Sequence, residues 1–424
     1  MKYFPITLGA AFLAAQPAFF GPSVSKGATT DLTTQIDSIV QARIGADAFS
    51  GVVLVARNGG VIYQRAVGMA NRETRMPMKM DTKLQIASMT KLFTQIAIQQ
   101  LAQEGRLSLT DTVGKWLPGY PNATVRRKVT VDQLLHHRSG IGSFWNKRFL
   151  AEHSNVRTTR DYMNLFENDS LLFEPGTNQA YSNGGYVLLG AIIERVTGEP
   201  YHAYVRHHIL EPAGMTGTAP YDSRVTSPDA AIGYTRQDPG QPGAADQRLA
   251  GPSRRPGDGT VKERTPSPQP IPPIPDSSAG GAPRLLIIGP DGRQLSPDEA
   301  RAAVARHNQS KAPLAPNTAF EAGVSGPAGD DFSTAPDLLR LATALTSHRL
   351  LDSAHTNAVL GSRFTGGGEF RANGGGPGVN AEFSIYPTGE VIVAISNYDP
   401  PAATAIAESI RSLIGSSAAT TPNR

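Results

Sequence analysis

Two pairs of predicted strands lie near opposite ends of this 424-residue chain and leave few ways to fold it. The first pair covers Gly51 to Ala56 and Val61 to Val67, and Asn58-Gly59-Gly60 between them is typical of a hairpin turn. The second pair covers Ala381 to Tyr386 and Val391 to Ser396. We therefore expect one sheet assembled from distant segments, with a largely helical region inserted between its halves.

The region between the strand pairs contains apolar residues at helical spacing. We expect helices from Ser88 to Gln103, from Val131 to Leu135 and from Gly184 to Val196. An amphipathic helix with Asp31 as its N-cap precedes the first strand pair, and a helix from Ala402 to Ile414 follows the second. This order of elements predicts an α+β fold.

The first 28 residues have the pattern of an export signal. Lys2 supplies a positive charge, and the apolar stretch Ile6 to Phe20 precedes small residues at which cleavage is expected, namely Ser23, Ser25, Gly27 and Ala28. A bilayer span needs roughly 20 apolar residues, so an uncleaved anchor is the less favoured alternative. The sequence predicts a signal peptide over residues 1–28 and a secreted or periplasmic protein without a transmembrane span after its removal.

A Pro- and Gly-rich insertion at about residues 237–282 is expected to interrupt a single two-lobed domain over residues 29–415. The insertion has almost no aromatic residues and cannot bury much surface, so we expect it to be disordered or loosely held. A short strand from Arg284 to Ile288, a helix from Ser296 to about His307 and a flexible tail over residues 416–424 are also expected.

The charge of the chain gives no sign of a nucleic-acid partner. The formal net charge is +4, and the only local basic cluster lies at residues 254–264, inside the Pro-rich insertion, where a solvated loop is the simpler interpretation. The chain has no Cys, which excludes disulfides and thiolate metal sites.

Ser88-Met89-Thr90-Lys91 is an S-x-x-K motif with a geometric rationale. Residues three apart on a helix share a face, so the Lys91 amine can reach the Ser88 hydroxyl. Free N–H groups at a helix start also favour an oxyanion there. Burial or nearby positive charge must lower the lysine pKa from about 10.4 for the amine to act as a base. The motif alone is weak, because Ser23-Val24-Ser25-Lys26 matches it and an ordinary N-cap would also place a serine at position 88.

Tyr181-Ser182-Asn183 is a Y-x-N motif. A tyrosine beside the nucleophile can relay its proton, and the Asn183 amide can hold Lys91 and a substrate carbonyl. Tyr120 and Tyr162 begin matching tripeptides, but Tyr181 stands in a loop that enters an apolar helix, a location suited to a cleft. A core tyrosine beside a capping asparagine is the alternative.

Together these motifs resemble those of the serine β-lactamase-related family. The resemblance covers about residues 35–235 and 322–415, and it rests on the S-x-x-K and Y-x-N motifs with the runs Leu134-Leu135-His136-His137-Arg138-Ser139-Gly140-Ile141 and Phe173-Glu174-Pro175-Gly176. The family includes class C β-lactamases, D-alanyl-D-alanine carboxypeptidases, D-amino-acid peptidases and esterases. It implies a β-lactamase/transpeptidase-like fold, in which an antiparallel sheet flanked by helices and an all-helical lobe enclose the site.

The third motif of this family is altered here. It reads Lys-Thr-Gly or His-x-Gly in the family, on a strand that faces the serine, whereas alignment on Pro-Gly places Ala372 at the basic position. Gly374 keeps the glycine, which allows close substrate approach, and the N–H near Gly375 is expected to be the second oxyanion donor beside that of the serine. The partner for a substrate carboxylate is lost unless Arg371 or Asn373 substitutes after a one-residue shift.

The resemblance and the motifs predict a serine hydrolase that forms an acyl-enzyme at Ser88, with Lys91 and Tyr181 moving protons and Asn183 orienting the reactants. An ester, a D-amino-acid peptide or amide, or a β-lactam would fit as substrate, and the missing basic side chain favours the first two. A non-catalytic or weakly active binding protein with the same fold is the alternative.

We expect no cofactor and no metal. The histidine pairs at 136–137 and 207–208 point in different directions on a helix, and H-E-x-x-H does not occur. No G-x-S-x-G occurs either, which argues against an α/β-hydrolase elbow. The expected partner is a small-molecule or peptide substrate, and a monomer is the expected state.

Overall fold

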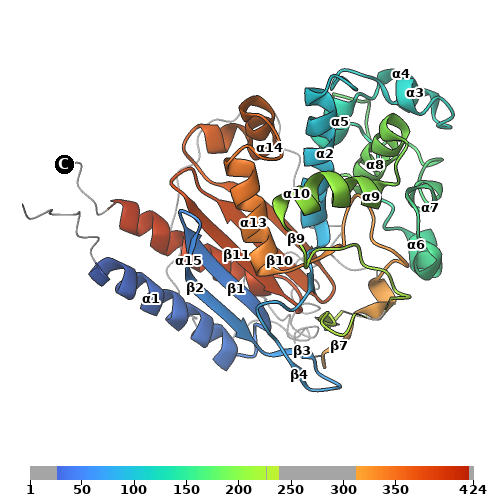
Figure 1. Cartoon of the computed structure of the whole chain (residues 1–424). Helices are drawn as coiled ribbons and strands as arrows, with labels where there is room; N and C mark the ends of the chain where they lie inside the picture. Colours follow the sequence, from blue (N-terminus) through green and yellow to red (C-terminus); the bar gives the residue numbers. More distant parts are fainter. Residues whose placement is uncertain (1–25, 226, 238–311, 420–424) are drawn as a thin grey trace, which may run out of the picture.

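A computed structural model describes residues 26–225, 227–237 and 312–419 of the chain (Figure 1). The predictions for residues 1–25, for the Pro-rich insertion beyond Gln237 with its basic cluster, for the elements at 284–307 and for residues 420–424 lie outside the described residues. None of the described helices is both long enough and apolar enough to cross a membrane.

The centre of the fold is a five-stranded antiparallel sheet with the order β2-β1-β11-β10-β9. Its strands are β1 (Gly51–Arg57), β2 (Gly60–Val67), β9 (Phe370–Gly376), β10 (Val379–Ile385) and β11 (Glu390–Ser396). Strand β1 pairs with β11 from Gly51 opposite Ser396 to Arg57 opposite Glu390. The predicted sheet of distant segments is therefore confirmed, and β9 extends it at the edge beside the helical region.

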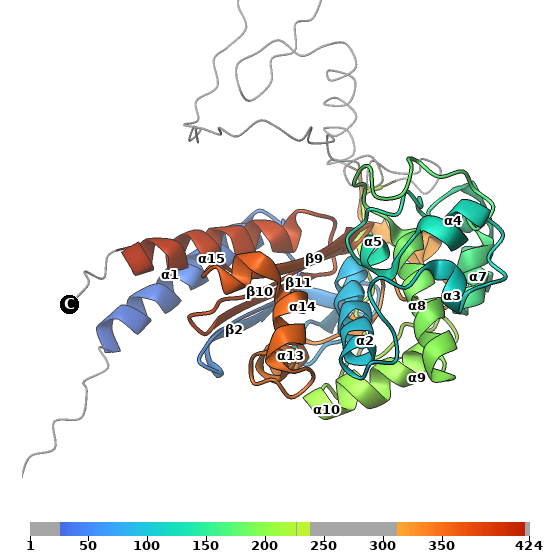
Figure 2. The same ribbon diagram turned by 90° about the horizontal axis from the view of Figure 1, so that it is seen from above.

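The central strands are apolar on both faces because both faces are covered. Side chains alternate across a strand, so Val52 and Leu54 enter the larger core while Val53 and Val55 enter a second core on the opposite face. Helices α1 (Lys26–Gly45) and α15 (Ala402–Ala419) lie side by side over the second core (Figure 2). A continuous apolar run is the expected pattern for a strand buried in this way.

Helix α1 begins at Lys26, inside the segment expected to be a signal and five residues before Asp31. The predicted N-cap at Asp31 is therefore wrong. Aspartate is tolerated inside a helix at a cost of less than about 1 kcal/mol, so a residue typical of caps does not by itself begin one. At the other end, α15 continues to Ala419, four residues into the predicted tail.

The other face of the sheet is covered by α13 (Ala335–Thr346) and α14 (Ser353–Thr365), and beyond them lies the helical lobe (Figure 1). The lobe and the segments around it contain α2 (Lys91–Gln103), α3 (Val113–Trp116), α4 (Ala123–Lys128), α5 (Val131–Leu135), α6 (Lys147–Glu152), α7 (Thr159–Asn164), α8 (Asn183–Thr197), α9 (Tyr201–Val205) and α10 (Glu211–Ala213), with the short turns η1 (Ala87–Thr90), η2 (His153–Asn155), η3 (Arg206–Leu210) and η4 (Thr318–Phe320). Three two-stranded ladders complete the described structure, formed by β3 (Met69–Asn71) with β4 (Met76–Pro77), β5 (Leu84–Gln85) with β8 (Phe332–Ser333), and β6 (Tyr234–Thr235) with β7 (Ala315–Pro316).

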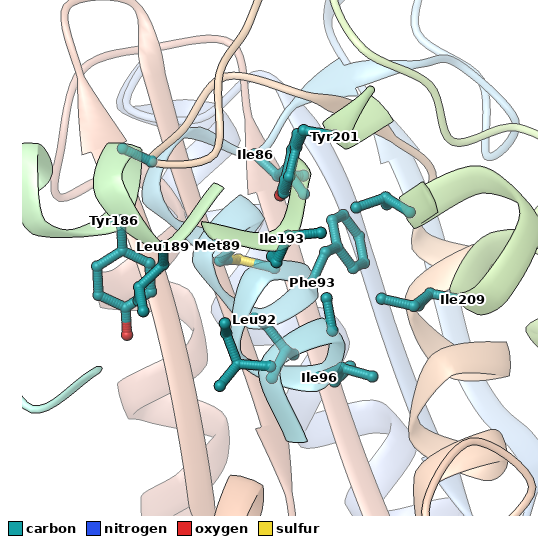
Figure 3. Close-up of a cluster of buried hydrophobic side chains, with 14 of the residues drawn as sticks. Ile86, Met89, Leu92, Phe93, Ile96, Tyr186, Leu189, Ile193, Tyr201 and Ile209 are labelled. Atoms are coloured by element: carbon teal, nitrogen blue, oxygen red, sulfur yellow. The ribbon is translucent and has the colours of Figure 1, made fainter. Parts of the chain in front are cut away.

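Helix α2 is buried between the sheet and the lobe. Its Leu92, Phe93 and Ile96 pack with Leu189 and Ile193 of α8 (Figure 3). Tight packing on nearly all sides holds the helix rigidly, and η1, which carries Ser88, leads directly into it. The predicted helix from Ser88 to Gln103 is thus a turn of 3₁₀ helix continued by α2.

Candidate active site

Four polar side chains predicted from sequence converge on one another at the start of α2. The Tyr181 hydroxyl donates to Ser88 Oγ at 2.7 Å, and Lys91 Nζ lies 3.1 Å from the same oxygen. Lys91 Nζ also donates to Asn183 Oδ1 at 2.8 Å and to the carbonyl of Ala328. The structure therefore joins the S-x-x-K and Y-x-N motifs into one cluster, although Tyr181 lies 93 residues from Ser88 in the chain.

The local backbone presents Ser88 while hiding its neighbours. Ser88 is half-buried, whereas Ala87, Met89 and Thr90 on either side are buried. Ala87 has a φ of 45°, an uncommon conformation for a residue other than glycine and one that recurs at functional sites. The Ser88 side chain caps neither η1 nor α2, so the N-cap alternative for this serine is not supported.

The asparagine of the second motif is likewise free of a capping role. Ser182 is the N-cap of α8, and its Oγ accepts from the N–H of Gly185 at 2.8 Å. Asn183 is the first residue of the helix, and its side chain lies between Lys91 and Ser143. The capping alternative therefore applies to Ser182 and leaves Asn183 available to the site.

Burial controls the charge of Lys91. Its side chain is 6 % exposed, and removal from water lowers its pKa to about 7, although the negative charge of Asp330 acts in the opposite direction. The amine also lies 4.9 Å from the centroid of the Tyr181 ring. A substantial fraction of Lys91 is then neutral near pH 7, as a base must be.

The pKa of Tyr181 is shifted in the opposite direction. Burial raises its pKa to about 12, partly offset by the hydrogen bond to Ser88. The phenol therefore keeps its proton at neutral pH and donates a hydrogen bond to the serine oxygen. In this pair the lysine can accept a proton and the tyrosine can pass one on.

His137, one of the paired histidines that were not expected to bind a metal, packs against the Tyr181 ring. The two rings are 4.6 Å apart, and His137 Nδ1 accepts from the N–H of Ser182 at 3.2 Å. Burial, together with the charge of Lys91, lowers the pKa of His137 to about 4, so the ring is neutral. His137 therefore positions Tyr181 without adding charge to the cluster.

Strand β9 passes against the backbone of the nucleophile turn at Gly374. A Cβ at this position would lie 2.2 Å from the Ile86 carbonyl oxygen and 2.9 Å from the N–H nitrogen of Ser88, which leaves room only for glycine. Gly375, the next residue, lines the same cavity as Ser88. Both predicted glycines thus lie at the site.

No neighbouring side chain replaces the basic group that is missing from the third motif. Ala372 is partly buried and packs against the larger core. Arg371 bonds to Glu382 at 3.2 Å, and Arg411 of α15 binds the same carboxylate oxygen at 2.8 Å. Arg371 is therefore held in an ion pair, and neither it nor the exposed Asn373 is among the described residues that line the cavity. The expected substitution by Arg371 or Asn373 is not supported.

A loop at residues 326–331, which is not among the site residues predicted from sequence, forms the wall beside the cluster. Its carbonyls accept from Lys91 at Ala328 and from Thr94 at Pro327. Its backbone also pairs with the nucleophile turn, since the Asp330 N–H donates to the carbonyl of Ala87 at 3.1 Å. Most of these contacts use backbone atoms, so the side-chain pattern could not predict them. The Gly-Pro-Ala-Gly run before α13 is the one sequence feature that indicates a tight loop here.

Ser88 opens into a cavity of about 470 Å³. The cavity lies between β9, the start of α6 and the segment from Asn317 to Asp330, and its apolar lining includes Phe144, Trp145 and Phe320. Among the described residues, no group of three or more His, Asp or Glu side chains is placed to hold a metal ion. The arrangement suits acyl transfer, because a nucleophile, a base and a proton donor meet at the wall of a cavity.

Comparison with known proteins places this chain in a family. The family described as Beta-lactamase matches residues 36–411. Penicillin-binding protein 4* of Bacillus subtilis is 35% identical over 181 residues, which are 42% of this chain and 39% of that protein. The chain thus spans about two fifths of the length of that curated relative.

Two solved structures share the fold over most of both chains. A penicillin-binding protein from Bacillus halodurans has a TM-score of 0.63 at 22% identity and covers 90% of this chain and 98% of its own. A D-amino acid amidase from Ochrobactrum anthropi has a TM-score of 0.63 at 22% identity, with 91% and 99% covered. With an antiparallel sheet, a helical lobe and a family match over most of its length, this chain belongs to the β-lactamase family.

Proposed function

We propose that the protein is a serine hydrolase that acts through a covalent acyl-enzyme formed at Ser88. The proposal rests mainly on one observation, the simultaneous contact of Ser88 Oγ with the Tyr181 hydroxyl and the buried Lys91 amine. A serine whose hydroxyl contacts a lysine of lowered pKa is an activated nucleophile.

The steps follow from the protonation states. When Lys91 is neutral, the 3.1 Å contact reverses, and the Ser88 hydroxyl donates to Nζ. Lys91 takes this proton as Ser88 attacks the substrate carbonyl, and the N–H groups of Ser88 and Gly375 stabilise the oxyanion. Tyr181 passes a proton to the leaving group and is reprotonated from Lys91, and water then attacks the acyl-enzyme with the same groups in reverse.

The proposed substrate is an ester or an amide of a D-amino acid or peptide, with a β-lactam as a weaker candidate. The absence of a basic side chain from the cavity face of β9 supports this order, because the carboxylate of a β-lactam or of a peptide C-terminus would lack its partner there. A structural neighbour is named as a D-amino acid amidase, which is compatible with the amide. We also propose a secreted or periplasmic location, from the sequence of residues 1–28.

The test is hydrolysis of a chromogenic short-chain ester and of a chromogenic cephalosporin, alongside labelling with a fluorescent phosphonate. We expect ester hydrolysis and a label that maps to Ser88, both absent from Ser88→Ala. Label on another residue would disprove the assignment. A folded protein that no acylating probe modifies would favour the alternative of a binding protein, which the loss of a basic residue at Ala372 supports.

A further inference from the structure

Asp330 occupies a position that its own surroundings do not explain. It lies in the left-handed region, with a φ of 78°, beside the nucleophile turn. It is half-buried and lines the cavity into which Ser88 opens. Within the described residues, its carboxylate makes neither a hydrogen bond nor an ion pair, although its neighbour Asp331 accepts from Ser325 at 2.6 Å.

Such a carboxylate is costly unless a partner reaches it. Burial disfavours the charged form and raises the pKa of Asp330, and the backbone conformation adds strain. The charge of Lys91 acts on it, but the Lys91 amine is directed at Ser88, Asn183 and Ala328. Asp330 is half-buried and lines the cavity, so a group bound in the cavity can become its partner.

The charges around the cavity have one prevailing sign. Asp330 and Glu321 both line it, and Glu321 is already satisfied in part by Gln85 Nε2 at 3.1 Å. The one cationic side chain among the described lining residues is Lys147, which is exposed. A negatively charged acyl group would therefore be repelled, and a positively charged one attracted.

We propose that Asp330 forms a subsite for an ammonium group on the acyl part of the substrate. This proposal rests on the proposed hydrolase function and names its substrate class as the esters or amides of amino-bearing acids. The ammonium group supplies the positive charge and the N–H donors that the Asp330 carboxylate can accept.

The subsite also connects substrate binding to the base. The charge of Asp330 favours protonated Lys91, so a bound ammonium group that neutralises this charge favours the neutral amine. A cationic substrate would thereby promote the form of Lys91 that accepts the serine proton.

The experiment compares two esters of nearly equal shape, the 4-nitrophenyl esters of β-alanine and of butanoic acid, which differ by an ammonium in place of a methyl group. Ser88→Ala serves as the blank for spontaneous hydrolysis. We expect the wild-type protein to prefer the ammonium ester in kcat/KM by about tenfold or more, as for a charge-assisted hydrogen bond. In Asp330→Asn, the preference should fall to near one.

Asparagine is the suitable replacement because it keeps the size of the side chain and accepts the left-handed conformation. The ratio of the two esters cancels any change in Lys91 that affects both. As a matched control, Glu73→Gln removes the same unit charge from an exposed turn and should keep the wild-type ratio.

Binding separates the failure of this proposal from that of the hydrolase function. Titration calorimetry with n-butylammonium and with 1-butanol measures the subsite without turnover, and we expect only the ammonium to bind, with affinity lost in Asp330→Asn. Ser88-dependent hydrolysis of both esters at equal rates, or ammonium binding unchanged by Asp330→Asn, would overturn the subsite. Ammonium binding without hydrolysis of either ester would leave the subsite standing and contradict the hydrolase function.

Discussion

The two sides of the cavity differ in how completely their polar groups are paired. On the side of α2 and α8, Ser88, Lys91, Tyr181 and Asn183 form one connected set of hydrogen bonds. On the facing side, Ala372 of the altered β9 packs against the larger core, and the carboxylate of Asp330 lacks a hydrogen bond within the described residues. The paired side is suited to a reaction, and the unpaired side to the selection of a ligand.

Because of this difference, bond breaking and substrate selection are expected to depend on different residues. Bond breaking depends on groups that are fixed before the substrate arrives. Selection depends on groups that gain partners only when the correct substrate binds. Changes on the paired side should therefore abolish turnover, whereas changes on the facing side should alter which substrate is preferred.

The largest expected effect is on the paired side. Ser88→Ala removes the nucleophile, and we expect ester turnover to fall by about 10⁴-fold or more. Measurement of kcat on a chromogenic ester checks this, with the exposed Ser412→Ala of α15 as the matched control that keeps wild-type turnover. Turnover in Ser88→Ala close to that of the wild type would mean that another residue carries the reaction.

The sequence predicted the paired side only as far as local geometry reaches. The spacing of Ser88 and Lys91 on one helical face was enough to predict their contact. The choice of Tyr181 over Tyr120 and Tyr162 needed the surrounding loop and the apolar helix that follows it, because no local rule joins residues 93 apart. The confirmed sheet followed from the strand patterns, whereas the predicted N-cap at Asp31 failed because the helix continues past it.

The facing side was less predictable for a physical reason. Its contacts to the cluster use the carbonyls of Pro327 and Ala328, and any residue can supply a carbonyl. Alignment with the family motif was enough to show that Ala372 replaces a basic residue. The ion pair that occupies Arg371, however, also involves Glu382 and Arg411 of α15. No sequence pattern brings these two residues together on Glu382.

The second prediction concerns the contact between the two sides at Gly374. Gly374→Ala places a Cβ against Ile86 and Ser88, and the resulting shift of the nucleophile turn should lower kcat/KM by about 100-fold. The matched control is Gly376→Ala on the same strand, whose Cβ would meet nothing within 4 Å. Equal activity of the two variants would show that the close approach of β9 does not hold Ser88 in place.

The third prediction is a pH dependence. The proposed mechanism requires the neutral form of Lys91, whose pKa is about 7, so kcat/KM for a neutral ester should fall about tenfold for each pH unit below 7 and level off above it. Because the pKa of Tyr181 is about 12, its deprotonation should not limit the rate at mildly alkaline pH. Rate measurements from pH 5 to pH 9 provide the test.

The variant Asp330→Asn tests the same assignment of Lys91 through a residue on the facing side of the cavity. Its negative charge raises the pKa of Lys91, so its removal should move the acidic limb to lower pH. An acidic limb at the same pH in this variant, or no decline in rate below pH 7, would show that Lys91 is not the titrating base.

The smallest expected effect comes from restoring charge to β9. Ala372→Lys places an ammonium at the family's basic position, and a carboxylate-bearing ester should gain about tenfold or less in kcat/KM relative to its methyl ester, because the new charge is only partly buried. Ala372→Gln, which extends a side chain without charge, controls for size and should leave that ratio unchanged. If Lys and Gln give the same ratio, then the acceptors of the facing wall, Asp330 and Glu321, exclude carboxylates more strongly than the missing base does, and combining Ala372→Lys with Asp330→Asn should then release the gain.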